Sequence, residues 1–136
     1  MNFRDQELLA LRPELRNAVV RDNMSSEEQF QNGTLRPIVK LQNELLLEVF
    51  RNYIAKHKNV FYTLTIDRRM NYIANAIQKD IKFRNSLKGM VIGQFTIEEY
   101  RSYILNSSAL NKRMMNLVRE RVQSNIQLLE KAEALN

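Results

Sequence analysis

The scarcity of turn-forming residues is the feature of this sequence that most constrains its fold. Glycine occurs three times and proline twice in 136 residues. Sheet proteins change direction often and use these residues at their turns, so a chain with so few of them favours long helices joined by few loops. The length fits one domain. We therefore expect an all-α fold, a single-domain helical bundle of four or five helices in which two long helices form the frame.

Capping residues and apolar spacing give the approximate bounds of these helices. A Ser, Thr or Asp before an apolar run marks a helix start, because its side chain accepts a hydrogen bond from a free N–H of the first turn. Thr34, Thr65 and Thr96 are expected to be such caps, and Asp80 to mark a kink or a cap. The expected helices cover residues 25–33, 35–58, 66–92 with an interruption near Asp80, 97–105 and 108–132.

The first 24 residues have the least regular pattern, and we expect them to form a partly ordered arm outside the helical domain of residues 25–136. Pro13 should end any helix that begins near Asp5, because the residue before a proline avoids the helical conformation. Six apolar side chains favour an arm laid across a neighbouring element, since leaving them in water is costly. They are Leu8, Leu9, Leu11, Leu15, Val19 and Val20.

The helix expected over residues 35–58 carries an unusually wide apolar stripe. One row at helical spacing consists of Ile38, Leu41, Leu45, Val49 and Tyr53. A second row beside it consists of Leu46, Phe50 and Ile54. A stripe this wide is typical of a central helix with neighbours on more than one side. Together with the apolar face of residues 108–132, it favours a protein that associates with other proteins or with copies of itself.

Positive charge is concentrated in the middle of the chain. Residues 1–34 contain four Arg and six acidic residues, a net charge of −2, whereas residues 35–136 contain seventeen basic and nine acidic residues, a net charge of +8. Residues 51–88 alone hold nine bases and two acids. Such a centre attracts anionic partners, whether nucleic acid, a phosphate ligand or an acidic protein.

One helical face in this basic centre is a candidate site for anions or nucleic acid. Steps of four, three, four and three residues place its members on one side of the third helix; they are Arg68, Tyr72, Asn75, Lys79 and Lys82, and Arg69 and Arg84 could widen the patch. Cations suit phosphates, an aromatic ring stacks on bases and an amide bonds to base edges. The simpler interpretation, which the sequence favours, is the solvated side of an amphipathic helix.

The residue inventory offers little for catalysis, metals or a membrane. Cysteine is absent, and His57 is the single histidine, so we expect no metal site, no cofactor and no catalytic residue. At the end of a predicted helix, His57 is expected to have a capping or surface role rather than a catalytic one. The start lacks the basic-then-apolar profile of a signal peptide, and no run of about 18 apolar residues occurs, so we expect a cytoplasmic protein that does not enter membranes.

Three segments resemble a small family of uncharacterised bacterial proteins, some of which carry a glyoxalase label. The segments are residues 34–42, which read TLRPIVKLQ, residues 53–58, which read YIAKHK, and residues 83–89, which read FRNSLKG. The resemblance covers most of the chain and implies no catalytic residue, cofactor or partner. The sequence leaves three functions open: a non-enzymatic interaction or assembly protein that forms homo-oligomers, a nucleic-acid or phosphate binder, and a metal-independent enzyme.

Overall fold

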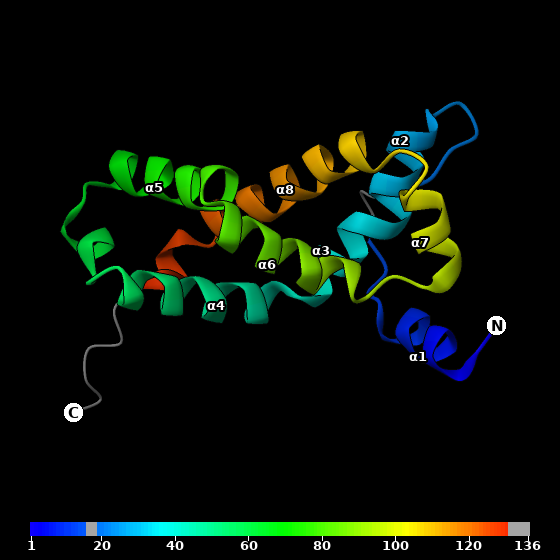
Figure 1. Ribbon diagram of the computed structural model, residues 1–136, viewed down its shortest axis with the longest axis horizontal. Coiled ribbons are helices and arrows are strands. Elements are labelled where there is room, and N and C mark those ends of the chain that lie inside the picture. The colour runs from blue at the N-terminus through cyan, green and yellow to red at the C-terminus, as the bar shows by residue number, and fades with distance from the viewer. Residues whose placement is uncertain (16–18, 131–136) are drawn as a thin grey trace.

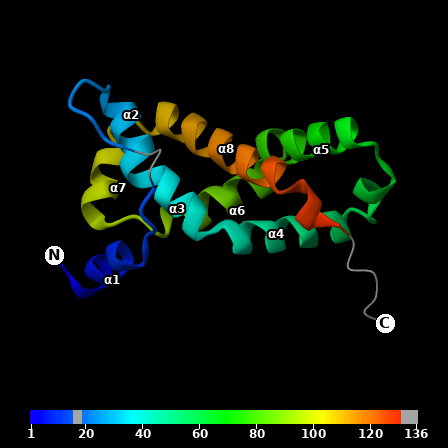
Figure 2. The ribbon, with the colours of Figure 1, turned by 180° about the vertical axis from the view of Figure 1, so that it is seen from behind.

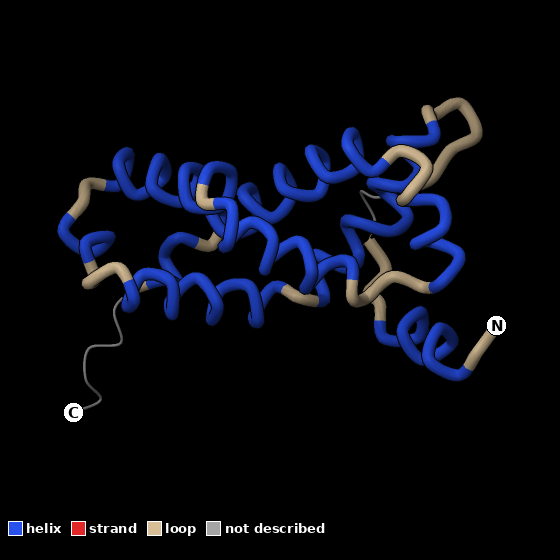
Figure 3. Tube along the Cα trace, in the orientation of Figure 1, coloured by secondary structure: helices blue, strands red, loops and turns tan. Residues whose placement is uncertain are grey.

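The chain is all-helical in the computed structural model, which describes residues 1–15 and 19–130 and contains no strand among them (Figures 1 and 3). The described residues form more helices than the four or five expected. The α-helices are α1 (Phe3–Leu11), α2 (Ser26–Phe30), α3 (Arg36–Leu41), α4 (Asn43–Lys56), α5 (Ile66–Lys79), α6 (Ile81–Ile92), α7 (Ile97–Tyr103) and α8 (Ser107–Ser124). A π-helix, η1 (Gln31–Leu35), and two 3₁₀ helices, η2 (Val60–Thr63) and η3 (Ile126–Leu129), complete them.

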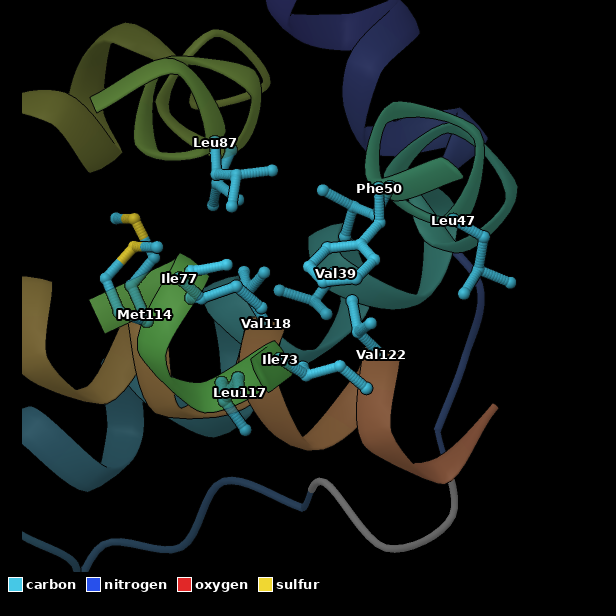
Figure 4. Close-up of a cluster of buried hydrophobic side chains, with 14 of the residues drawn as sticks. Val39, Leu47, Phe50, Ile73, Ile77, Leu87, Met114, Leu117, Val118 and Val122 are labelled. Carbon is cyan, nitrogen blue, oxygen red and sulfur yellow. The ribbon is translucent and has the colours of Figure 1, made fainter. Parts of the chain in front are cut away.

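The helices form an elongated bundle. In both ribbon views α5 and α8 lie along one long edge, α4 lies along the other, and α6 runs between them, while α1, α2 and α7 gather at the N-terminal end (Figures 1 and 2). The core fills the space between α3, α4, α5, α6 and α8, as Figure 4 shows. Its fully buried side chains include Ile38, Phe50, Ile54, Ile73, Ile77, Leu87, Met114 and Val118. No described helix is both long enough and apolar enough to cross a membrane.

The first long helix is divided, which accounts for part of the difference in helix number. Gln42 lies between α3 and α4 with φ −86° and ψ 4°, outside the helical region. Its side-chain amide donates a hydrogen bond to the backbone oxygen of Met90, 2.9 Å away. Thr34 was expected to cap this helix, and that expectation was wrong, because the chain continues from α2 through the π-helix η1 into α3. The Thr34 hydroxyl instead donates to Glu99.

Other helix boundaries follow the capping residues. Thr65 and Thr96 accept hydrogen bonds from the N–H groups three residues later, and Thr96 forms a full capping box with Glu99. Asp80 ends α5 and caps α6 through Phe83 N. The last helix was expected to reach residue 132, but α8 ends at Ser124 and the 3₁₀ helix η3 follows. Residues 131 and 132 of the expected range lie outside the described residues.

The N-terminal arm is held by polar contacts. The Asp5 carboxylate accepts a hydrogen bond from Ile97 N at 3.1 Å. Arg4 donates to the carbonyl oxygens of Gly93 and Phe95 at 2.8 and 2.9 Å. These contacts place α1 against the turn between α6 and α7. The apolar side chains that were expected to hold the arm contribute less, since Leu9, Leu11, Val19 and Val20 are between 40% and 62% exposed.

Candidate interaction groove and the basic face

Helix α4 presents two apolar rows, and only one of them lies in the core. Leu46, Leu47, Phe50 and Ile54 are buried, at most 3% exposed. The other row consists of Leu45, Val49 and Tyr53, which follow one another at intervals of four residues and so share a face of the helix. Leu45 is 48% exposed, and Val49 and Tyr53 are partly buried. The second row therefore faces outward beside the core.

Helix α6 forms the other wall of a groove above this row. Gln42 of the α3–α4 junction bonds to Met90 near the end of α6, and the Tyr53 hydroxyl donates to Asp80 at its start, 2.9 Å away. Residue numbers thus rise along α4 while they fall along α6, so the two helices are antiparallel. These two hydrogen bonds fix the helices at both ends of the groove and leave its middle open.

The groove has a volume of about 610 Å³ and a mostly apolar lining. Its apolar residues are Leu45, Val49, Tyr53, Phe83 and Met90, and its polar residues are Glu48, Asn52, Lys56, His57, Asp80, Lys82 and Ser86. From Leu45 to His57 it follows α4 for about 18 Å, or just over three turns. These dimensions suit a short helical segment laid along the groove, a common mode of peptide recognition.

An aromatic stack closes one end of the groove. The Tyr53 ring lies 4.1 Å from the Phe83 ring and 4.1 Å from the His57 ring, measured between centroids. His57 ends α4, and its Nδ1 lies 2.8 Å from the Tyr53 carbonyl oxygen. This is the capping position that the sequence predicted for His57. The stack orients the Tyr53 ring so that its hydroxyl donates a hydrogen bond to Asp80.

The Tyr53–Asp80 pair is fixed in one protonation state near neutral pH. Burial, together with the hydrogen bond to Asp80, raises the pKa of Tyr53 well above its usual value. The same hydrogen bond, with another from Phe83 N, lowers the pKa of Asp80. Tyr53 therefore stays a donor and Asp80 an ionised acceptor. The pair orders the end of the groove.

Two lysines make this end of the groove basic. Lys56 and Lys82 line it, and both are exposed. Glu48 lies farther along and is paired with Arg51 at 2.7 Å. Asp80 is already engaged by Tyr53 and Phe83 N. The groove therefore has an apolar middle and a basic end, which favours an occupant with apolar and acidic side chains.

A smaller hollow of about 390 Å³ lies on the other side of the Tyr53–His57 stack. Val60, Tyr72, Asn75 and Ala76 complete its lining. The Tyr72 hydroxyl is buried and has no hydrogen-bond partner among the described residues. A buried hydroxyl of this kind calls for a water or a ligand group, which this hollow has room for.

The predicted basic face is only partly assembled. Arg68, Asn75, Lys79 and Lys82 are exposed, but the break at Asp80 puts Lys82 and Arg84 on α6 while the others lie on α5. Tyr72 turns inward, 5.4 Å from the Phe61 ring, so its ring is half-buried and lines the smaller hollow instead of the exposed face.

The two arginines that were expected to widen this face are engaged in the fold. Arg69 donates to the carbonyl oxygens of Leu64 and Tyr62 and pairs with Glu130 at 3.0 Å. Arg84 donates to the carbonyl oxygen of Gln78. Among the described residues, no group of three or more His, Cys, Asp or Glu side chains could hold a metal ion.

Comparison with known proteins gives no relative. No protein-family model, no curated protein and no solved structure matches this chain.

Proposed function

We propose that this chain is a non-enzymatic assembly protein that associates with other copies of itself through the groove between α4 and α6. The observation that carries the proposal is the second apolar row of α4. Leu45, Val49 and Tyr53 repeat as regularly as the core row beside them, but Leu45 is 48% exposed, and Val49 and Tyr53, which pack against the edge of the core, also line a groove. Burying an exposed Leu or Val side chain fully contributes about 1.5–3 kcal/mol, which favours an occupant.

Charge favours a second copy as the occupant. The groove ends at Lys56 and Lys82, in a stretch with nine bases and two acids, whereas residues 1–34 carry a net charge of −2. One copy thus offers a basic groove and also an acidic segment that complements it. A net charge of +6 opposes close approach of whole molecules, so such contacts should be weak and confined to complementary surfaces.

The test is the mass of the full chain in solution from micromolar to millimolar concentration, by light scattering or sedimentation equilibrium. We expect the mean mass to rise with concentration. Val49→Glu, in the middle of the groove, should keep the chain monomeric because it places a charge in the apolar contact. Leu105→Glu is the matched control, since Leu105 is 85% exposed and lies outside the groove. A wild-type chain that stays monomeric throughout, or a Val49→Glu variant that associates like wild type, refutes the proposal.

A second candidate function is binding of nucleic acid or phosphate at the exposed part of the basic face. It is favoured by Arg68, Lys79 and Lys82, which are exposed and form no ion pair within the described residues. Binding of a short DNA duplex or single strand should weaken steeply with salt. Arg68→Glu with Lys79→Glu should weaken it further, whereas Lys112→Glu on α8 should have less effect. Binding that responds to neither salt nor the paired change excludes this function.

A further inference from the structure

We infer that the element of a second copy that enters the groove is the outer face of α1, so that copies join head to tail. This inference rests on the proposed function. Helix α1 has two sides with different surroundings. Successive residues of an α-helix are turned by about 100°, so Asp5, Leu8 and Arg12 share one side and Phe3, Glu7 and Ala10 share the opposite one. Asp5 and Arg12 hold the first side against the α6–α7 region.

The outer side of α1 is the most exposed apolar surface of the arm. Phe3 is 77% exposed and Leu11, at its margin, is 62% exposed, and Glu7 and Ala10 between them are also exposed. Figure 1 shows α1 at the N-terminal end of the molecule, clear of α4 and α5. The helix is thus fixed on one side by its own bundle and presents the other side to solvent, as a docking element should.

The spacing of the two apolar anchors matches the groove. Phe3 and Leu11 are eight residues apart on α1, and Leu45 and Tyr53 are eight residues apart on α4. Both intervals correspond to a rise of about 12 Å along a helix, within the length of about 18 Å over which the groove follows α4. Phe3 and Leu11 can therefore face the two ends of the outward row at the same time.

Charge fixes the direction in which α1 lies. Glu7 is in the middle of its outer side, and Glu14 follows three residues after Leu11. Glu14 therefore lies just beyond the C-terminal end of α1, while Lys56 and Lys82 mark one end of the groove. Placing Leu11 at the lysine end puts Glu14 beside these cations. The docked α1 then runs parallel to α4.

Head-to-tail contact follows because the two surfaces are different. Each copy has one outer face of α1 and one groove, so every copy can bind one neighbour through each surface. A contact of this kind is heterologous and gives open chains, or a ring if the rotation closes. A nine-residue helix buries less area than a standard interface, so we expect weak association that grows with concentration.

The test combines two variants of the full chain. Val49→Glu blocks the groove and keeps α1, while Phe3→Ser with Leu11→Ser removes the outer face and keeps the groove. Each should weaken self-association about tenfold or more and be monomeric alone, since tenfold corresponds to the burial of about one apolar side chain. Mixed in equal amounts, they should form a 1:1 heterodimer and nothing larger. Ile104→Ser with Leu105→Ser, at exposed apolar positions elsewhere, is the matched control.

The outcomes separate this inference from the proposed function. If Val49→Glu is monomeric but Phe3→Ser/Leu11→Ser associates like wild type, the groove is used and α1 is not its occupant. If both variants are monomeric and their mixture stays monomeric, the two surfaces do not meet, and the inference is overturned. If wild type itself does not associate, the proposed function fails and the inference fails with it. Circular dichroism of each variant checks that its helices are retained, and Phe3 and Leu11 are exposed enough to change without loss of the core.

Discussion

The two ends of this bundle are stabilised in different ways. At the end formed by η2 and the neighbouring parts of α4, α5 and α6, aromatic rings pack against one another; we call it the aromatic end. At the other end, α1 and the α6–α7 region are joined by hydrogen bonds and ion pairs; we call it the polar end. In this small helical protein, one set of residues packs the core and a separate set attaches the arm. The two sets should therefore respond differently to acid, to salt and to the loss of a single charge.

The aromatic end centres on Phe50. Its ring lies between 5.8 and 6.3 Å from the rings of Tyr53, Phe61, Tyr72 and Phe83. Two of these four pairs, with Phe61 and Tyr72, are edge-to-face, an arrangement that suits the charge distribution of aromatic rings. Arg69 adds a cation 5.2 Å from the Phe61 ring centroid. Most of this region is therefore held by apolar burial, which responds little to salt or to acid.

The polar end centres on Glu99. Both of its carboxylate oxygens accept hydrogen bonds from Arg12, each at 2.6 Å. Thr34 and Thr96 N also donate to it, at 3.0 and 2.8 Å. Arg12 comes from the arm, Thr34 from η1 and Thr96 from the start of α7, so one carboxylate joins three parts of the chain. This region should therefore respond to acid and to the loss of a single charge.

The largest effect is expected at the aromatic end, from Phe61→Ala. Phe61 is fully buried and contacts Phe50, Tyr72 and Arg69, so the change leaves a cavity beside three partners. We expect a loss of about 3–5 kcal/mol in the free energy of unfolding. Urea unfolding followed by circular dichroism measures it. Val60→Ala, at a 48% exposed neighbour, is the control. Equal effects of the two changes would show that the aromatic end is not a packed core.

A smaller effect is expected at the polar end, from Arg12→Ala. The Arg12 and Glu99 side chains are 7% and 17% exposed, so the change leaves a nearly buried carboxylate without its cation. We expect a loss of about 2 kcal/mol, in the range for hydrogen bonds to charged groups. Amide hydrogen exchange should show faster exchange in α1 and little change in α5. Arg21→Ala, at an exposed arm residue, is the control. Protection lost equally in α1 and α5 would contradict the separation of the two ends.

Acid should weaken the polar end before the aromatic end. Burial alone would raise the pKa of Glu99, but hydrogen bonds from Arg12, Thr96 N and Thr34 outweigh it and lower the pKa. A carboxyl with a lowered folded pKa stabilises the fold above its unfolded pKa and loses that contribution as pH falls through the folded value. The protection of α1 amides, measured relative to their intrinsic exchange rate at each pH, should therefore fall on acidification below the ordinary glutamate range. Glu99→Gln should abolish this dependence; if the dependence persists, another carboxylate holds the arm.

The smallest expected effect is a gain in stability from Gly89→Ala on α6, which joins the two ends. An added Cβ at Gly89 would meet nothing within 4 Å, and its φ is not positive. Alanine restricts the unfolded chain and favours a helix, so we expect a gain of about 0.5–1 kcal/mol. Because α6 spans both regions, the midpoint of thermal unfolding should rise. The ratio of amide hydrogen exchange rates in α1 and α5 should stay the same. Gly93→Ala is the contrasting variant, because its Cβ would lie 3.1 Å from Gly89 O.

Local features of the fold could be predicted from the sequence, whereas contacts between distant segments could not. The caps at Thr65, Asp80 and Thr96 follow from side chains that bond within three residues. The row of Leu45, Val49 and Tyr53 on α4 was also predicted, since helical spacing alone defines it, but its exposure was not, because the wide stripe favoured neighbours on more than one side. The division at Gln42 was not, because glutamine is a good helix former and its bond to Met90 spans 48 residues. The Arg12–Glu99 pair spans 87 residues, and nothing near either residue indicates it.

The candidate basic face illustrates the same limit. Helical spacing grouped Arg68, Tyr72 and Asn75 on a common side of α5, but spacing does not say how wide the buried face is. Tyr72 follows Phe50 and Phe61 into the interior because α4 and η2 cover that side of α5. Arg69 donates to two carbonyl oxygens at the C-terminal end of η2, which no periodicity can reveal. The groove could not be predicted either, because its walls come from α4 and α6, and the sequence does not give the position of one helix relative to the other.

The π-helix η1 makes the register between α2 and α3 depend on a single residue. A π-turn contains about one residue more than an α-turn, so removing one residue between 31 and 33 would allow a continuous α-helix. All side chains of α2 would then be rotated by about 100° about the helix axis relative to α3. Phe30 would turn away from Phe95, whose ring is now 5.5 Å away, and Glu27 would turn away from Arg113. The π-turn of η1 thus sets the rotation of α2 about its axis relative to α3. With this rotation, Phe30 of α2 faces Phe95 before α7, and Glu27 of α2 faces Arg113 on α8.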